Sequence, residues 1–178
     1  MSFSHILLPE FDQEMKNTRK LLERVPNGKF DYQPHPKSMK MGRLATHVAE
    51  LPSWATMTLN TELLELDPGY KPHIAKTQAE LLEIFDKAVA EARAKIEAAT
   101  DEDWGKMWTL KFGGREVFSM PRTAVVRAVV MNHMIHHRAQ LGVYLRMNEI
   151  AIPGMYGPSA DEMAADGPSY FPVQNTRA

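Results

Sequence analysis

Three histidines lie within five residues of the chain, in a segment that otherwise has the apolar character of a buried helix. They are His133, His136 and His137. Residues four apart in a helix lie on one face, about one turn from each other, so His133 and His137 can share a metal ion. His133 and His136 are also neighbours on a helix surface, because residues three apart are adjacent too. Helical periodicity by itself leaves both pairs open.

Two imidazoles supply only two ligands, and the best candidate for a third is His47. This histidine lies in a second apolar helical run, residues 41–51. Since His47 and His133 are each near the middle of a predicted helix, both can lie at one level of a helical bundle. Burying several imidazoles without strong partners is costly, which favours a shared metal ion over separate core histidines. Three neutral nitrogen ligands would leave coordination positions for water or a substrate.

Other polar residues near the histidines have two interpretations each. Gln140, one turn after His137, can hydrogen-bond a ligand's second ring nitrogen or face solvent. Arg138 can pair with an acidic substrate or with a neighbouring helix. Asp161 and Glu162 can reach a cation or remain solvated. No general acid or base is assigned from the sequence, and no role is given to three histidines in loops or at the terminus, His5, His35 and His73.

Composition predicts one domain over residues 1–178 and excludes several classes of function. A length of 178 residues with 44% hydrophobic and 24% charged residues is ordinary for one globular domain. The 21 basic residues are scattered among 22 acidic ones, so nothing indicates nucleic-acid binding. No apolar run is long enough for a membrane span, and the N-terminus lacks a signal-peptide pattern. We therefore expect a cytoplasmic protein that binds neither nucleic acid nor membrane.

The chain contains no cysteine. Disulfides, thiolate ligands and a cysteine nucleophile are thereby excluded. Any metal must be held by nitrogen and oxygen atoms, and any thiol chemistry needs a thiol that a small molecule supplies.

Four long helical segments are expected to position the histidines. The first is predicted over residues 9–25, and the second runs from an N-cap at Ser38 towards residue 60 with a kink at Pro52. The third begins with a capping box at Thr77. The fourth runs from Ser119 or Pro121 to about Arg146. Residues 108–118 alternate around a Gly-Gly pair and predict a small hairpin or an extended excursion. The tail from residue 152 is expected to be an ordered loop or a flexible end. This set of elements predicts an all-α four-helix bundle.

The histidine pattern as a whole resembles the DinB family of four-helix-bundle metalloproteins. The matching residues are His47, then His133, His136, His137, Arg138, Gln140, Leu141 and Tyr144-Leu145-Arg146, followed by the tail segment 152–159. The resemblance covers most of the chain in order. It implies an up-down-down-up bundle, frequent dimerisation, and a metal held by His47, His133 and His137. On this resemblance His136 becomes a neighbour of the site and not a ligand.

The resemblance implies less about function than about fold. Related bundles include thiol-dependent transferases and a mycothiol-dependent isomerase, in which the metal binds the thiol of a low-molecular-weight cofactor. We therefore expect Zn²⁺, Ni²⁺ or Fe²⁺ and a small-molecule substrate, with transfer by a bound thiol or hydrolysis by activated water. The alternatives are a non-catalytic, stress-related binding module with a structural metal, and a metal-free bundle whose histidines belong to the core.

Overall fold

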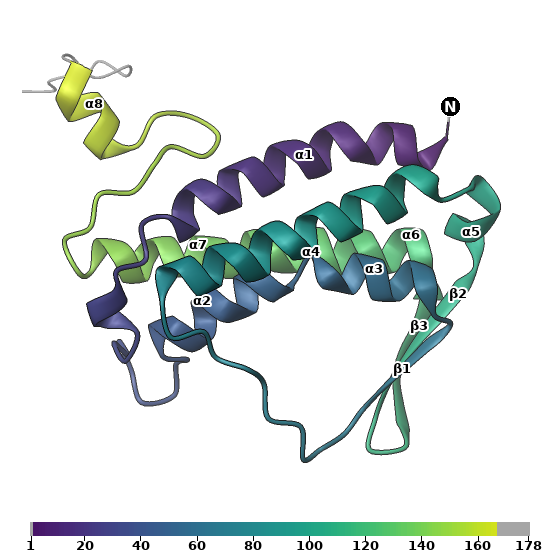
Figure 1. The fold of residues 1–178 in the computed structure, drawn as a ribbon. Coiled ribbons are helices and arrows are strands. Elements are labelled where there is room, and N and C mark those ends of the chain that lie inside the picture. Colours follow the sequence, from purple (N-terminus) through teal and green to yellow (C-terminus); the bar gives the residue numbers. More distant parts are fainter. Residues whose placement is uncertain (1, 167–178) are drawn as a thin grey trace, which may run out of the picture.

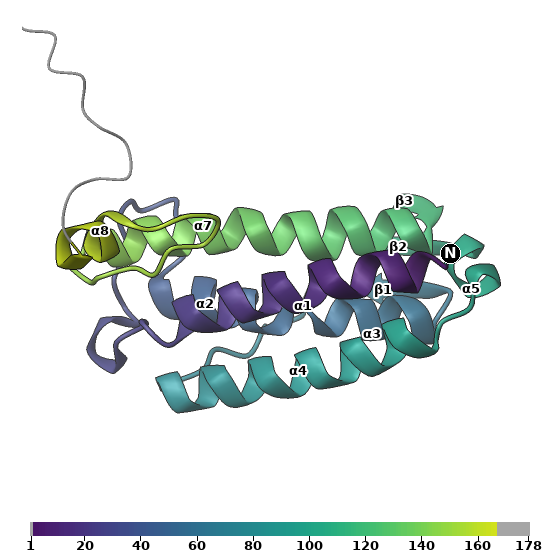
Figure 2. The same ribbon diagram turned by 90° about the horizontal axis from the view of Figure 1, so that it is seen from above.

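Four helical arms run lengthwise side by side in the computed structural model, which describes residues 2–166 (Figure 1). The arms are α1 (Phe3–Leu22); α2 (Met41–Glu50) with α3 (Ser53–Asn60); α4 (Gln78–Ala98); and α6 (Arg122–Val125) with the π-helical segment η2 (Val126–Asn132) and α7 (His133–Arg146). α1 and α2 each pack against both α4 and α7, so the arms enclose a shared core. Seen from above, α1 and α7 run alongside each other with α4 at one side (Figure 2). The expectation of a mostly helical chain is confirmed.

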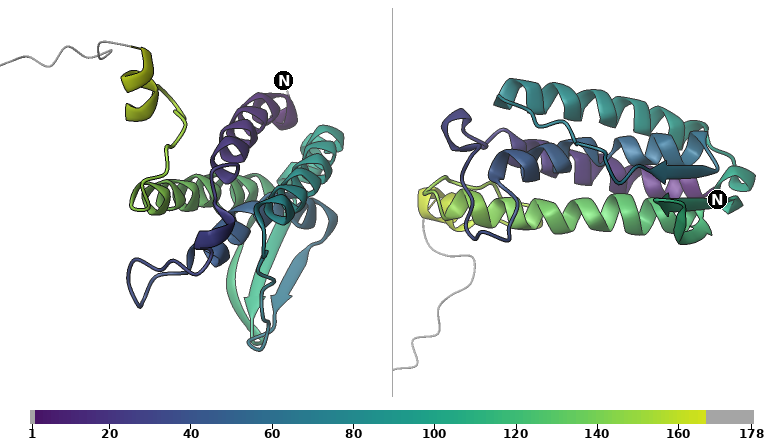
Figure 3. Two further views of the ribbon diagram at one scale, coloured as in Figure 1. Left: turned by 60° about the vertical axis from the view of Figure 1, so that its left-hand side comes forward. Right: turned by 90° about the horizontal axis from the view of Figure 1, so that it is seen from below.

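A small three-stranded sheet lies at one end of the helical arms (Figure 3). Its strands, in the order β1-β2-β3, are β1 (Leu63–Leu66), β2 (Met107–Phe112) and β3 (Arg115–Pro121). β2 and β3 form the predicted hairpin, with Gly113 and Gly114 at positive φ between them. β1 pairs with β2 in parallel and was not predicted. The all-α prediction is therefore corrected by this small sheet.

Two groups of buried side chains hold these parts together. The larger core receives at least one fully buried residue from every arm, including Phe11, Leu44, Phe85 and Met134. The smaller cluster consists of Trp108, Leu110 and Val125, and it attaches the sheet to the end of α6. Two short elements, η1 (Asn27–Lys29) and α5 (Asp101–Gly105), lie in connections between the arms, and α8 (Ala160–Asp166) is the last element described.

The first helix begins six residues earlier than the sequence predicts. The side chain of Ser2 accepts a hydrogen bond from the backbone N–H of His5, so the helix starts at Phe3. Pro9 consequently lies inside the helix and not in its first turn. The helix ends at Leu22, three residues before the predicted end.

The predicted N-cap at Ser38 is wrong. α2 begins at Met41 after Lys40, whose side chain makes no capping bond. Instead, the backbone N–H groups of Met41 and Gly42 donate to the carbonyls of Tyr32 and Phe30. A preceding loop therefore satisfies the free donors at this helix start, and no side-chain signal is needed. The helical run is interrupted at Pro52, as the sequence predicts: α2 ends at Glu50 and α3 begins at Ser53.

The predicted capping residue of α4 is confirmed. Thr77 accepts from the backbone N–H of Glu80, as in the first half of a capping box. The Glu80 carboxylate accepts from the backbone N–H of Lys76 and lies beside His73, so the reciprocal bond of the box is replaced. A complete capping box occurs at α5, between Thr100 and Asp103.

The tail is an ordered loop over residues 152–159 and then continues into α8. Asp161 accepts from the backbone N–H of Ile152, and Glu162 accepts from that of Gly154. These two carboxylates hold the loop closed, and a contact of either with a cation stays a prediction. The predicted tail beyond residue 166 lies outside the described residues. Among residues 2–166, no helix combines the length and apolar character that a membrane crossing requires.

Candidate metal centre

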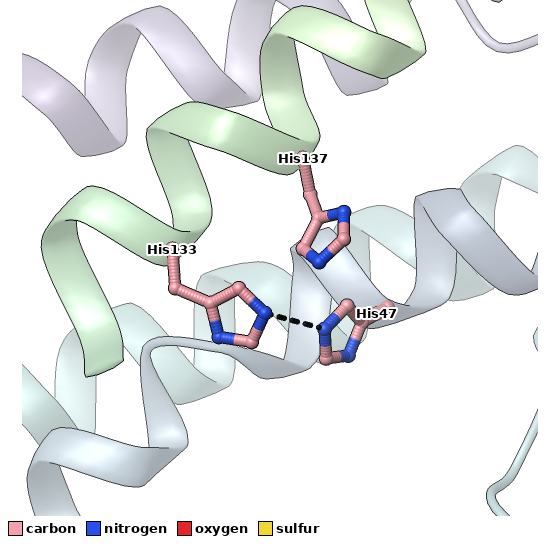
Figure 4. A group of neighbouring side chains, drawn as sticks. All are labelled: His47, His133 and His137. Carbon is pink, nitrogen blue, oxygen red and sulfur yellow. Dashed lines mark hydrogen bonds between the residues drawn. The ribbon is translucent and has the colours of Figure 1, made fainter. Parts of the chain in front are cut away.

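His47, His133 and His137 lie close together, with their rings turned toward one another (Figure 4). His47 comes from α2, and the other two come from successive turns of α7. Their ring centroids are 4.6–5.0 Å apart, and one nitrogen of each lies within 4.8 Å of the other two. The structure thus brings together the three residues that the sequence singles out, across a separation of 86 residues.

Each of the three rings has a hydrogen-bond acceptor at its Nδ1 atom. Nδ1 of His47 lies 3.0 Å from the Glu50 carboxylate, and Nδ1 of His133 lies 3.2 Å from the Val129 carbonyl. Nδ1 of His137 lies 2.7 Å from the side-chain oxygen of Gln140. An acceptor at Nδ1 places the proton there and leaves Nε2 as a lone pair. All three imidazoles are therefore set to present Nε2.

The Nε2 atoms of His47 and His133 are 3.3 Å apart. With both Nδ1 atoms protonated, two lone pairs face each other at this distance, which is repulsive unless a cation or a proton lies between them. Two imidazole nitrogens bound tetrahedrally to a zinc ion at about 2.0–2.1 Å lie about 3.3–3.4 Å apart. The His47–His133 pair therefore fits a metal ion in both charge and spacing, and a nitrogen of His137 lies within 4.8 Å of both.

The protonation state of the rings favours metal binding. Burial is the largest cause that lowers the pKa of His133, followed by the nearby His47. Burial likewise lowers the pKa of His137 to about 4, against the opposing effect of its bond to Gln140. Both rings are thus neutral at neutral pH, the form that binds metal ions.

A π-helical segment leads directly into His133. The backbone N–H of His133 donates to the Val130 carbonyl, and not to Val129 as it would in a regular α-helix. The Val129 carbonyl instead lies within hydrogen-bond distance of the His133 ring. The π-helical turns before His133 are wide, and such turns are frequent at functional sites, whereas the bond made by His133 itself spans three residues and closes a tighter turn. Here the local change in helical register supplies the acceptor that orients a candidate ligand.

Sequence comparison extends over nearly the whole chain. The profile of the DinB family matches residues 1–175. The chain belongs to the DinB family. A curated relative, the uncharacterized protein YrdA of Bacillus subtilis (strain 168), is 25% identical over 162 residues, which cover 90% of this chain and 92% of YrdA.

Solved structures of DinB-like proteins have the same fold. One from Bacillus cereus ATCC 10987 superposes with a TM-score of 0.64 at 20% identity, covering 84% of this chain and 95% of that one. The DinB-like protein YjoA from Bacillus subtilis superposes with a TM-score of 0.63 at 17% identity, covering 85% and 98% respectively. At these identities the likeness concerns the fold alone. The family resemblance inferred from the histidine pattern is confirmed.

Gln140 and Arg138, the other residues that the sequence of this DinB-family chain singles out, lie on different sides of α7. Gln140 contacts the ring of His137 as proposed, and it also contacts exposed His136 at 3.1 Å. Arg138 points to the opposite side, where it forms a buried ion pair of 2.7 Å with Glu14 of α1. Tyr156 donates to the same carboxylate. Arg138 and Tyr156 therefore join α7 and the tail loop to α1 through Glu14.

One site residue of the DinB-family chain, Glu50, was not predicted from the sequence. Glu50 contacts the ring of His47 and also forms an ion pair of 3.1 Å with Arg43, so Arg43 holds the carboxylate that orients the ring. The available signal was the spacing of three between His47 and Glu50 on one helix face. Many such spacings occur by chance on a helix surface, and only the tertiary structure gives this one a role.

Proposed function

We propose that this DinB-family protein is a metal-dependent enzyme whose divalent ion is held by His47, His133 and His137. One observation carries the proposal. The three Nδ1 atoms all have acceptors, so three Nε2 lone pairs are available in one small group, an arrangement that a shared cation would stabilise. Imidazole nitrogens in this number suit Zn²⁺, Ni²⁺ or Fe²⁺. We further propose that the four arms form the up-down-down-up bundle of the family as one domain.

A catalytic role is favoured over a structural metal by the number of ligands. Structural zinc sites are normally closed by four protein ligands, whereas catalytic sites have three and an open position. Among the described residues, the candidate group contains three histidines and no fourth donor. Glu50 does not serve as one, because its contacts are with Arg43 and the outer nitrogen of His47.

Two reactions fit an open three-histidine site without protein thiols. A bound divalent metal lowers the pKa of a coordinated thiol or water, so that a nucleophile forms at neutral pH. The thiol of a low-molecular-weight cofactor would give a transferase, and water would give a hydrolase acting on a small molecule. The chain's own contribution is orientation: Glu50, Val129 and Gln140 hold the three rings in place.

Metal analysis tests the site. We expect near-stoichiometric zinc, nickel or iron in the purified protein and its loss in the variants His47→Ala and His137→Ala. His73→Ala is the matched control, because His73 is exposed and pairs with Glu80 away from the site. Wild-type protein that takes up none of these metals would rule the proposal out.

Cobalt substitution tests the open position. We expect 2-mercaptoethanol or a pH change to alter the visible spectrum of the Co²⁺ protein, since a thiolate or hydroxide would enter the coordination sphere. A spectrum insensitive to both would indicate a closed, structural site and exclude the enzyme.

A further inference from the structure

A cavity of about 470 Å³ opens beside His47. Its walls come from the end of α2, from α3, from β1 and from the loop that follows β1. His47 and Glu50 both line it, so the cavity reaches the candidate metal ligands. Its size is within the range of small-molecule sites, about 300–1,000 Å³.

We propose that this cavity, resting on the proposed metal function, binds the body of the substrate. The substrate class is a small molecule with a reactive head at the metal and an apolar chain or ring that carries no distal anion. Three features of the cavity support this substrate class: its apolar walls, the fixed position of β1 and the arrangement of charges.

The long walls of the cavity are apolar. They include Trp54 and Met57 of α3 and Leu64 and Leu66 of β1. All four side chains are half-buried and pack against the small cluster around Trp108. Apolar surface that is partly exposed along a cavity favours an apolar ligand, at about 25 cal/mol per Å² of surface removed from water.

The β1 wall is held in place by the rest of the fold. β1 pairs in parallel with β2 through four residue pairs. The loop after it is tied down where the backbone N–H of Ala75 donates to Thr46 of α2 at 3.0 Å, in a buried position. The cavity is therefore largely formed before any ligand enters, as is usual for small-molecule sites.

The charges that line the cavity disfavour an anionic chain. Its one guanidinium, Arg43, is paired with Glu50. Two further carboxylates, Glu65 and Asp67, lie along the β1 side. A carboxylate or phosphate at the far end of a ligand would find no unpaired cation in this lining and would meet like charges. A cationic end would be favoured, also by the aromatic face of Tyr70.

A second apolar groove of similar volume provides an internal control. It lies between α7 and the tail and is lined by Gly142, Val143, Met147 and Met155 among others. Its α7 residues lie on the face opposite His133 and His137 by helical geometry. Methionine side chains line both cavities: Met57 lines the proposed site, and Met147 and Met155 line the control groove.

Methyl NMR of protein labelled with [¹³C-methyl]methionine tests the proposal directly. The probes for the zinc-loaded protein are three hydroxamates with equal chains, ending in methyl, amine or carboxylate. We expect the Met57 methyl signal to shift saturably while those of Met147 and Met155 stay in place. The carboxylate probe should bind about tenfold more weakly than the methyl probe, and the amine at least as tightly.

A conservative variant checks the role of charge. Asp67→Asn preserves the oxygen that accepts from the Gly69 N–H and removes the carboxylate charge. We expect this variant to reduce the ratio of the dissociation constants of the carboxylate and amine probes about threefold. Glu83→Gln, on the exposed face of α4, is the matched control and should change nothing.

The outcomes separate this cavity from the metal site. If zinc binds but Met57 does not respond, or the carboxylate probe binds as well as the others, the cavity proposal is wrong and the metal site stands. If zinc does not bind, hexylamine, hexanol and hexanoate are titrated into the metal-free protein. If the Met57 signal shifts and hexanoate binds most weakly, the cavity proposal is supported although the metal function fails. If only the Met147 or Met155 signal shifts, the cavity proposal is wrong.

Discussion

At the residue scale, the arrangement around His47 depends on a carboxylate that takes no metal itself. Glu50 accepts at the outer nitrogen of His47, and Arg43 in turn holds Glu50. The side chain of His47 is 15% exposed and that of Glu50 is 26% exposed, so solvent screens this pair incompletely. A partner of this kind fixes the tautomer and the ring orientation of a metal-binding histidine.

We predict that Glu50→Ala lowers metal affinity about 10–100-fold without unfolding the protein, because His47 loses the acceptor that orients it. Competition with a chromophoric zinc chelator measures this. Glu83→Ala, on the exposed face of α4, should leave the affinity unchanged. Equal affinities for the two variants would show that Glu50 has no role in orienting His47.

At the element scale, α1 and α7 are tied by polar groups inside the molecule. Arg138 of α7 is 3% exposed and pairs with Glu14 of α1, which is 7% exposed. Arg138 also donates to the Thr18 hydroxyl, and Tyr156 donates to Glu14. Tyr156 as a whole residue is 70% exposed, but loss of water around its hydroxyl, followed by the bond to Glu14, raises the pKa of Tyr156, so the hydroxyl stays protonated and remains a donor. The tail loop is thus fastened to the same pair.

We predict that Glu14→Ala destabilises the protein by about 3–5 kcal/mol, because Arg138 is left as an unpaired buried charge. The double variant with Glu14→Leu and Arg138→Met should recover most of this loss. Urea unfolding gives the values. Asp12→Ala breaks the exposed pair with Arg93 and serves as the control, at less than about 1 kcal/mol. A loss as small as the control's would contradict the structural role of the buried pair.

The hairpin of the sheet has its own conformational requirement. Gly113 has φ +55°, and an added Cβ would lie 3.2 Å from Pro68 Cγ. We predict that Gly113→Ala costs about 1 kcal/mol or more in urea unfolding. Gly28→Ala is the control, because an added Cβ there meets nothing within 4 Å. The prediction fails if both variants have wild-type stability.

At the scale of the whole molecule, the candidate site joins arms that are distant in sequence. α2 carries His47, and α7 carries the other two histidines. A metal ion bound only by the folded protein would therefore link two walls of the core. Its binding free energy adds to the free energy of unfolding.

We predict that zinc at 100 times its dissociation constant stabilises the protein by about 2.7 kcal/mol and that a chelator reverses this. Thermal unfolding with and without zinc measures the effect. His133→Ala should unfold at the same temperature under both conditions. A zinc effect that persists in this variant would place the bound metal elsewhere.

The sequence by itself determined the helices that carry the candidate ligands and the residue types at the site. Helical periodicity, the Pro52 break, the Thr77 cap and the turn at Gly113-Gly114 are local signals, and each has its effect within a few residues. The family followed from the histidine spacing for the same reason, since it is a pattern along one chain.

Only the tertiary structure decided which faces meet. Periodicity left His136 and His137 equivalent as partners of His133, and packing of α2 against α7 places His137 beside His47. The start of α2 depends on the carbonyls of Tyr32 and Phe30, and β1 depends on a partner more than forty residues away. The role of Glu50 likewise required the ring of His47 to be held among other imidazoles. These contacts join segments that are distant in sequence, and local propensity does not specify which distant segments will be in contact in the folded protein.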